Sequence, residues 1–171
     1  MKSLILIIIF TICTFIGFVL SQNYSLRYEN LIYLEQCIKV LETEVVYGGA
    51  PLPEALTNVY KKGNHRVSFI FEEIKNDLLV NKRNYIYDSF FNIKEIMGDK
   101  LLLKKEDIDI FLGLGRLLGT NSRNDQKNSF KLILNQLNSQ ILEAKEEKSQ
   151  NEKLYRSLGM IAGFGITILL I

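Results

Sequence analysis

The stretch FLGLGRLLGTNSRNDQ, residues 111–126, decides the fold of this chain. Its first part is an apolar run that stops at Gly119, and a long helix with one polar face is predicted to begin just beyond it. Glycine inside a helix costs about 1 kcal/mol relative to alanine, so Gly113 and Gly115 indicate that another backbone comes close here. We therefore expect the preceding segments to pack toward this junction and the following helix to lead toward a membrane.

The long helix beyond the junction can be capped by Asn121 or Ser122, and no glycine or proline interrupts it from Thr120 to Leu158. It is therefore predicted to be about 40 residues long. Its apolar face consists of Phe130, Ile133, Leu134, Leu137, Ile141 and Ala144. Residues 157–171 carry no charge and predict a second membrane segment, although about 15 residues are short for a full span.

The N-terminal segment is a long apolar run. No residue from Ser3 to Leu26 is charged, and a helix needs roughly 20 apolar residues to cross a bilayer. The sequence therefore predicts a transmembrane anchor at residues 1–22. A cleaved signal peptide is the alternative, because Lys2 precedes the run and Val19-Leu20-Ser21 offers a cleavage site.

Charge beside the last segment sets the predicted orientation. The positive-inside rule places a domain on the cytoplasmic side when basic residues flank the membrane segment on that side. Four basic residues precede residues 157–171: Lys145, Lys148, Lys153 and Arg156. We therefore expect the helical domain, residues 23–156, to face the cytoplasm between two membrane segments.

Apolar residues spaced by three and four predict an all-α bundle of about six helices in this domain. Five of them precede the junction, and they run to about Tyr47, from Pro53 to Gly63, from Val67 to Leu78, from Tyr85 to Met97 and from Lys104 to Leu118. Gly48 and Gly49 are expected to end the first helix, and Pro51 prevents it from continuing. Ser68 or a residue just before it caps the third helix, and Gly98 stops the fourth.

Composition and motifs exclude several functions. The net charge of +2 comes from 21 basic and 19 acidic residues that are interspersed along the chain, so nucleic acid is not an expected partner. His65 is the only histidine and lacks neighbouring ligands for a metal. The sequence has no phosphate-binding loop, nucleophile elbow or zinc-protease motif. We expect neither an enzyme nor a cofactor.

Several stretches resemble the stage III sporulation protein AB family, and the resemblance spans essentially the whole chain. They are Leu41-Glu42-Thr43-Glu44-Val45-Val46-Tyr47-Gly48, Pro51-Leu52-Pro53-Glu54-Ala55-Leu56, Leu114-Gly115-Arg116-Leu117-Leu118-Gly119 with Arg123, Asp125 and Gln126, and residues 151–159. More distantly, the helical domain is similar to the cytoplasmic domain of type II secretion F proteins, which form an inner-membrane platform.

The resemblance implies a structural or adaptor subunit of a secretion-like channel complex between mother cell and forespore, needed for spore development. It places the protein in the mother-cell membrane around the forespore. It also implies as partners a secretion-type ATPase and the other membrane proteins of the complex, and self-association stays open. The alternative from another functional class is a membrane-anchored regulatory domain that binds a small ligand.

Five polar residues near helix ends and turns are the candidate partner-binding residues: Glu42, Glu44, Arg123, Asp125 and Gln126. Gly48, Pro51, Pro53 and Gly119 are expected to shape the turns around them. A purely structural role is the alternative for each residue. Asp125 and Gln126 would then serve the first turn of the long helix, and Arg123 would pair with Glu42 or Glu44 inside the domain.

Overall fold

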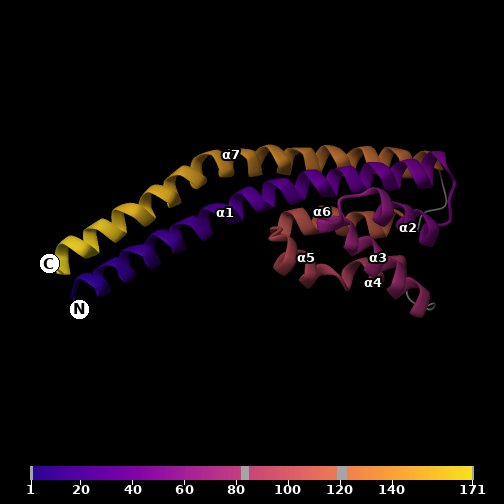
Figure 1. Ribbon diagram of the computed structural model, residues 1–171. Helices are drawn as coiled ribbons and strands as arrows, with labels where there is room; N and C mark the ends of the chain where they lie inside the picture. The colour runs from indigo at the N-terminus through magenta and orange to yellow at the C-terminus, as the bar shows by residue number, and fades with distance from the viewer. Residues whose placement is uncertain (1, 82–84, 119–122, 171) are drawn as a thin grey trace. The chain divides into compact units, whose positions relative to one another are not determined.

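The computed structural model describes residues 2–81, 85–118 and 123–170; for some residues near both ends, and for Arg123 and Asn124, it describes the backbone alone. All regular structure in these residues is helical, as the sequence predicts (Figure 1). The elements in chain order are α1 (Lys2–Glu42), the π-helical turn η1 (Thr43–Tyr47), α2 (Leu52–Lys62), α3 (His65–Val80), α4 (Ile86–Phe91), α5 (Lys94–Leu101), α6 (Lys105–Leu117) and α7 (Arg123–Leu170).

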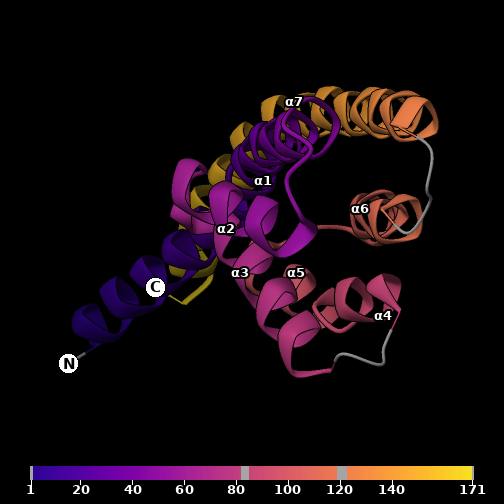
Figure 2. The ribbon, with the colours of Figure 1, turned by 90° about the vertical axis from the view of Figure 1, so that its right-hand side faces the viewer.

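The chain divides into two compact units. The bundle unit comprises Glu29–Ile141, and the end unit comprises Met1–Tyr28 with Leu142–Ile171. Each of the long helices α1 and α7 contributes a part to both units. Inside the bundle unit the parts of α1 and α7 run side by side, with α2, α3 and α6 beneath them and α4 beyond α6 (Figures 1 and 2).

The core of the bundle unit is centred on Phe111 of α6. Its ring packs edge-on against Phe71 of α3 at 5.6 Å between centroids, and against Phe90 of α4 at 5.4 Å. All three rings are fully buried. Helix α1 completes this core with buried residues at helical spacing: Leu31, Leu34, Ile38 and Leu41.

Gly115 explains why α4 can lie so close to α6. A Cβ atom built at this position would lie 2.9 Å from both Cβ and Cγ of Phe90, which is too close for any side chain. The close neighbour is therefore a side chain, and the expectation of a close backbone is wrong here. At Gly113 an added Cβ would meet only Ile133 Cδ1, at an ordinary 3.8 Å. Of the two glycines, Gly115 alone is required by this packing.

The predicted fourth helix, Tyr85 to Met97, is wrong in two respects. The segment forms two short helices, α4 and α5, which are separated at Asn92 and Ile93. Gly98 does not stop it either, because α5 continues to Leu101 and ends at Leu102, which has a left-handed backbone with φ of 54°. The buried amide of Asn30 donates to the Leu101 carbonyl oxygen at 2.8 Å and satisfies this helix end.

The helix caps also differ from the expectation at α3. Asn64 is the cap, and its side-chain oxygen accepts from the Arg66 N–H at 3.0 Å. Ser68 lies inside the helix instead, where its hydroxyl donates to the Tyr60 carbonyl oxygen at 3.1 Å and joins α3 to α2. At the junction, the expected stop at Gly119 and the expected caps Asn121 and Ser122 lie outside the described residues.

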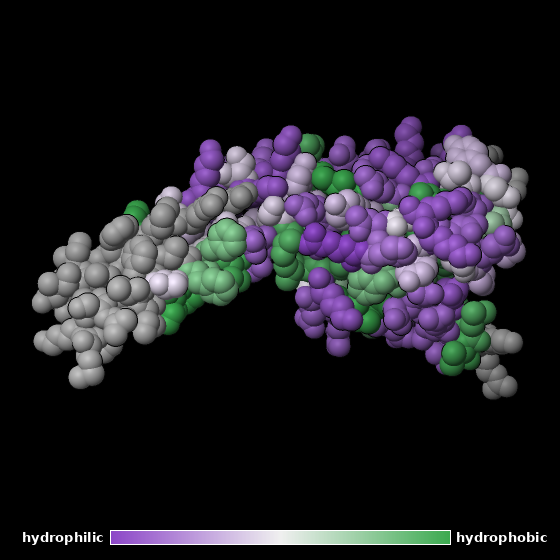
Figure 3. All heavy atoms as spheres, viewed as in Figure 1, coloured by the Kyte–Doolittle hydropathy of each residue, from purple (hydrophilic) through white to green (hydrophobic). Residues whose placement is uncertain are grey.

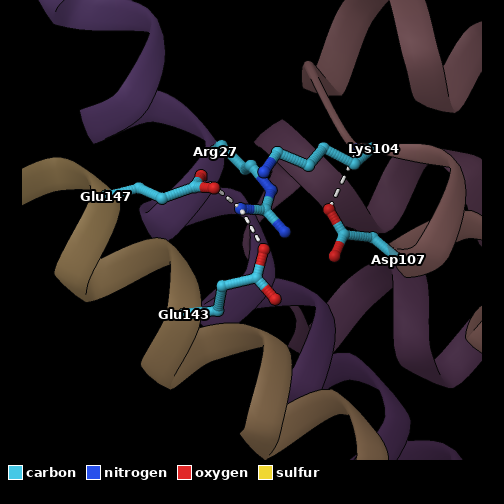
Figure 4. Close-up of polar contacts among 5 residues, drawn as sticks. All are labelled: Arg27, Lys104, Asp107, Glu143 and Glu147. Carbon is cyan, nitrogen blue, oxygen red and sulfur yellow. Dashed lines mark hydrogen bonds and ion pairs between the residues drawn. The ribbon is translucent and has the colours of Figure 1, made fainter. Parts of the chain in front are cut away.

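The end unit is an antiparallel pair of helix segments from α1 and α7. Arg27 is almost fully buried, and its guanidinium donates to Glu147 at 2.7 Å and lies 3.9 Å from Glu143 (Figure 4). Tyr24 stacks on Tyr155 of the facing helix at 5.7 Å between ring centroids. These contacts fix how the two helices are aligned along their length.

The long last helix is confirmed and is longer than predicted, since α7 continues for 48 residues to Leu170. Among the described residues, no helix contains a window long and apolar enough to cross a membrane. Much of the two predicted membrane segments, residues 1–22 and 157–171, consists of residues whose side chains lie outside that description.

Replacing Gly115 by alanine tests the close packing of α4 on α6. We expect Gly115→Ala to lower the free energy of unfolding by about 1–3 kcal/mol, because the added methyl group overpacks against Phe90. The matched control is Gly113→Ala in the same helix, which should be neutral or stabilising by up to about 1 kcal/mol. Denaturant unfolding followed by circular dichroism measures both. Equal effects of the two substitutions would contradict this account of the core.

Candidate functional site

Two stretches that are far apart in the sequence meet at one end of the bundle unit. The segment from η1 to the start of α2 lies beside the end of α6 and the start of α7. Together they enclose a hollow of about 290 Å³, which we call the corner hollow. Its lining residues are Val45, Gly49, Ala50, Leu52, Leu118 and Gln126. The two stretches are those in which the candidate partner-binding residues were predicted.

The wall on the η1 side owes its shape to a widened helical turn. Gly48 N–H donates to the Thr43 carbonyl oxygen at 2.9 Å, a bond that spans five residues and defines a π turn. Gly49 then takes a positive φ of 62°, which favours glycine. Pro51 stands just before the first helical residue of α2 and Pro53 lies in its first turn, where the missing N–H groups need no partner. The chain thereby reverses direction within a few residues.

Glu44 holds this turn against α2. One carboxylate oxygen accepts from Lys62 Nζ at 2.6 Å and the other from Asn58 Nδ2 at 2.9 Å. The hydrogen bond from Lys62, followed by that from Asn58, lowers the pKa of Glu44 below its ordinary value of 4.5. The side chain is only 15% exposed. Glu44 therefore acts within the domain, as the structural alternative expected, although with different partners.

The other predicted residues take different positions around the hollow. Gln126 is half-buried in its wall. Asp125 is exposed in the first turn of α7, where its charge complements the positive end of the helix dipole. Glu42 is half-buried at the end of α1, directly before η1. The backbone of Arg123 opens α7, but its side chain, like the whole of Gly119, lies outside the described residues.

Two exposed residues beside the hollow were not among the predicted ones. The ammonium group of Lys127 on α7 lies 5.9 Å from the centre of the Tyr47 ring at the end of η1. Tyr47 is 63% exposed, which is unusual for such a large ring. Tyr47 lies within a stretch that carries the family resemblance, which is the one signal that could have identified it. Nothing in the spacing of the sequence pairs it with Lys127.

The chemistry of this corner suits binding and offers little for catalysis. Its lining combines aliphatic side chains and glycine with the Gln126 amide, more of its surface is polar than apolar, and a cation lies over the exposed ring beside it. Within the described part of the chain, no group of three or more histidine, cysteine, aspartate or glutamate side chains could hold a metal ion. Such a hollow can take one side chain from a partner protein.

A family model, the sequence of a relative and a solved structure all point to the same family. The family model described as Stage III sporulation protein AB (spore_III_AB) matches residues 2–171. Stage III sporulation protein AB of Bacillus subtilis (strain 168) is 28% identical over 170 residues, which are 99% of this chain and 99% of that protein. A solved structure of Stage III sporulation protein AB (SpoIIIAB) superposes with a TM-score of 0.65 at 25% identity and covers 72% of this chain and 96% of its own.

Glu44 accepts hydrogen bonds from Lys62 and Asn58, and we call these contacts the Glu44 clamp. The clamp predicts a specific dependence of stability on pH. A carboxylate with a lowered pKa contributes stability that is present above its unfolded pKa and is lost as the pH falls through the folded pKa. Glu44→Gln should therefore unfold more easily than the unchanged chain at pH 7, and the difference should disappear in acid below the lowered pKa of Glu44. Thermal unfolding measured at a series of pH values tests this.

The control is the same substitution in a Lys62→Met chain. Since Lys62 is the main cause of the lowered pKa, Glu44→Gln should have a smaller effect there. An undiminished effect would show that Glu44 does not act through Lys62.

Proposed function

Because this chain belongs to the stage III sporulation protein AB family, we propose that it is a structural or adaptor subunit of the sporulation complex that links mother cell and forespore. In this proposal the protein carries out no chemistry of its own. It presents a helical domain at the mother-cell membrane, and another protein of the complex binds that domain. The role in sporulation follows from the family, and the adaptor role rests on the corner of the bundle unit.

The observation that carries the adaptor role is the convergence at the corner hollow. Val45 and Leu52 on one side and Leu118 and Gln126 on the other are far apart in the sequence, belong to stretches that carry the family resemblance, and line one hollow. Small-molecule sites usually measure roughly 300–1,000 Å³. At about 290 Å³ this hollow lies at the lower edge of that range, and it is large enough for one anchoring side chain of a partner protein.

Attachment to the membrane through both chain ends is the second part of the proposal. The apolar run of residues 4–20 and the uncharged residues 157–171 support it. So do the large apolar side chains that α1 exposes in the end unit, which include Ile12, Phe15, Ile16 and Val19. Figure 3 shows hydrophobic side chains, in green, on the surface of the end unit. Basic residues before the last segment favour the bundle unit on the mother-cell cytoplasmic side.

The partner class follows from the resemblance and from the chemistry of the corner. A secretion-type ATPase and the other membrane proteins of the complex are the proposed partners. The binding surface should bring an aliphatic side chain for the hollow and an acidic group for Lys127, whose charge lies over the Tyr47 ring at the surface. Asp125, exposed on the same helix, would then face a basic group of the partner.

Filling the hollow tests this proposal. Ala50→Phe places a ring where the partner's side chain would enter, so capture of the ATPase or of another complex member by the full-length chain should fall about tenfold. The matched control is Asn76→Phe, which adds the same ring at an exposed position on α3 and should leave capture unchanged. Both chains should keep the melting temperature of the unchanged protein. Undiminished capture by the folded Ala50→Phe chain would contradict the corner as the binding site.

A further inference from the structure

Two stacked tyrosines define one level along the helix pair of the end unit. Tyr24 of α1 packs on Tyr155 of α7, with 5.7 Å between the ring centroids and 19° between the ring planes. Because the two helix segments are antiparallel, the direction from Tyr24 toward the start of α1 is also the direction from Tyr155 toward the end of α7. The surface of the two helices can therefore be compared on either side of this stack.

Toward the chain ends, both helices expose large apolar side chains. Residues 3–23 and 157–171 contain no charged side chain. Among the described residues on this side of the stack, seven large apolar side chains are at least 40% exposed, which are Ile12, Phe15, Ile16, Phe18 and Val19 of α1 and Leu158 and Ile161 of α7. A group of exposed apolar side chains of this size marks a surface that is covered by a membrane or by another molecule.

Charged residues appear at the level of the stack or directly beyond it on both helices. On α1 the first of them is Arg27, and its guanidinium donates to Glu147 of α7 at 2.7 Å (Figure 4). On α7, Lys153 and Arg156 stand on either side of Tyr155 in the sequence, and Lys153 is exposed. The change from apolar to charged residues thus occurs at the same level on two helices that are far apart in the sequence.

This order of properties matches the surface of a phospholipid bilayer. Hydrocarbon covers exposed apolar side chains, tyrosine is enriched at the membrane–water interface, and basic side chains reach toward the lipid phosphates. In tyrosine the ring is apolar and the hydroxyl is polar, which suits a position between the two media. A protein partner would not require an apolar, an aromatic and a basic band to follow one another at one level on both helices.

We propose that Tyr24 and Tyr155 lie at the headgroup boundary of the membrane, with Lys153 beside the lipid phosphates. This inference rests on the proposed attachment through both chain ends, and it adds the depth to which the end unit enters the bilayer. The ion pair of Arg27 with Glu147 then lies outside the hydrocarbon, where charged groups are far less costly.

The helix geometry converts this boundary into a second depth. Phe15 precedes Tyr24 by nine residues, which corresponds to about 13 Å along an α-helix. The hydrocarbon core of a bilayer is roughly 30 Å thick, so its centre is about 15 Å from the boundary. Phe15, which is 65% exposed, should therefore lie near the middle of the bilayer.

Tryptophan fluorescence can measure these depths, because the chain contains no tryptophan of its own. Tyr24→Trp, Tyr155→Trp and Phe15→Trp each give the full-length chain a single fluorophore. The variants are reconstituted into vesicles of phosphatidylcholine and phosphatidylglycerol, in which the phosphatidylcholine carries bromine either near the headgroup or near the ends of the acyl chains. Tyr47→Trp, at an exposed position of the bundle unit, is the control that should escape both quenchers.

We expect Tyr24→Trp and Tyr155→Trp to give the same profile, with quenching about twofold stronger from the shallow bromines than from the deep ones. Phe15→Trp should show the opposite preference. Circular dichroism checks that each variant keeps its helical content. If a tryptophan in the stack disturbs the helix pair, Asn23→Trp reports the same level from an exposed position next to Tyr24.

Two kinds of failure can be distinguished. If Phe15→Trp is quenched by the deep bromines, attachment stands, and the proposed boundary is overturned when positions 24 and 155 differ in depth, lie as deep as position 15, or escape both quenchers. If Phe15→Trp also escapes both quenchers, the attachment itself is contradicted, and the proposed depth fails with it.

Discussion

The contact between Phe90 and Gly115 is the constraint on which the bundle unit depends. Phe111 and Gly115 lie one turn apart on α6, so the same helix face presents a ring and, next to it, a space without a side chain. Phe90 fills that space and meets Phe111, while Phe71 closes the other side of the Phe111 ring. Three helices are thereby held by contacts made by two residues of α6. The position of α4, and with it the surface rings Tyr87 and Phe91, follows from this one contact.

Much of this architecture could be predicted from the sequence, because apolar periodicity and turn residues act locally. Local patterns predicted the apolar stripe from Leu31 to Leu41 and the break at Gly48 and Gly49. They also predicted the start of α2 at its prolines and most of the length of α7. They did not predict the division between α4 and α5. Positions 86, 90, 93 and 97 keep a helical spacing across Asn92, so the periodicity gives no sign that the helix breaks there.

The candidate site shows the same limit of sequence reasoning. Glu44 and Gln126 were chosen for their places near turns, and both lie beside the corner hollow or in its wall. The partners of Glu44 could not be predicted, because Lys62 and Asn58 come from a helix that returns only after the chain reverses. Tyr47 and Lys127 belong to segments about 80 residues apart, and no local rule brings them together. Contacts of this kind require the folded chain.

The π turn at residues 43–47 has a consequence for how the family can vary in length. A π turn contains one residue more than an α-helical turn of the same rise, so it is the usual trace of a single-residue insertion in a helix. A homologue lacking one residue here could close the turn into α-helix and keep both the preceding stripe and the following prolines in place. It would lose the rotation that turns Glu44 toward Lys62. Such a deletion would therefore remove the stability that Glu44 gains from Lys62 and Asn58, and it would change the wall of the corner hollow.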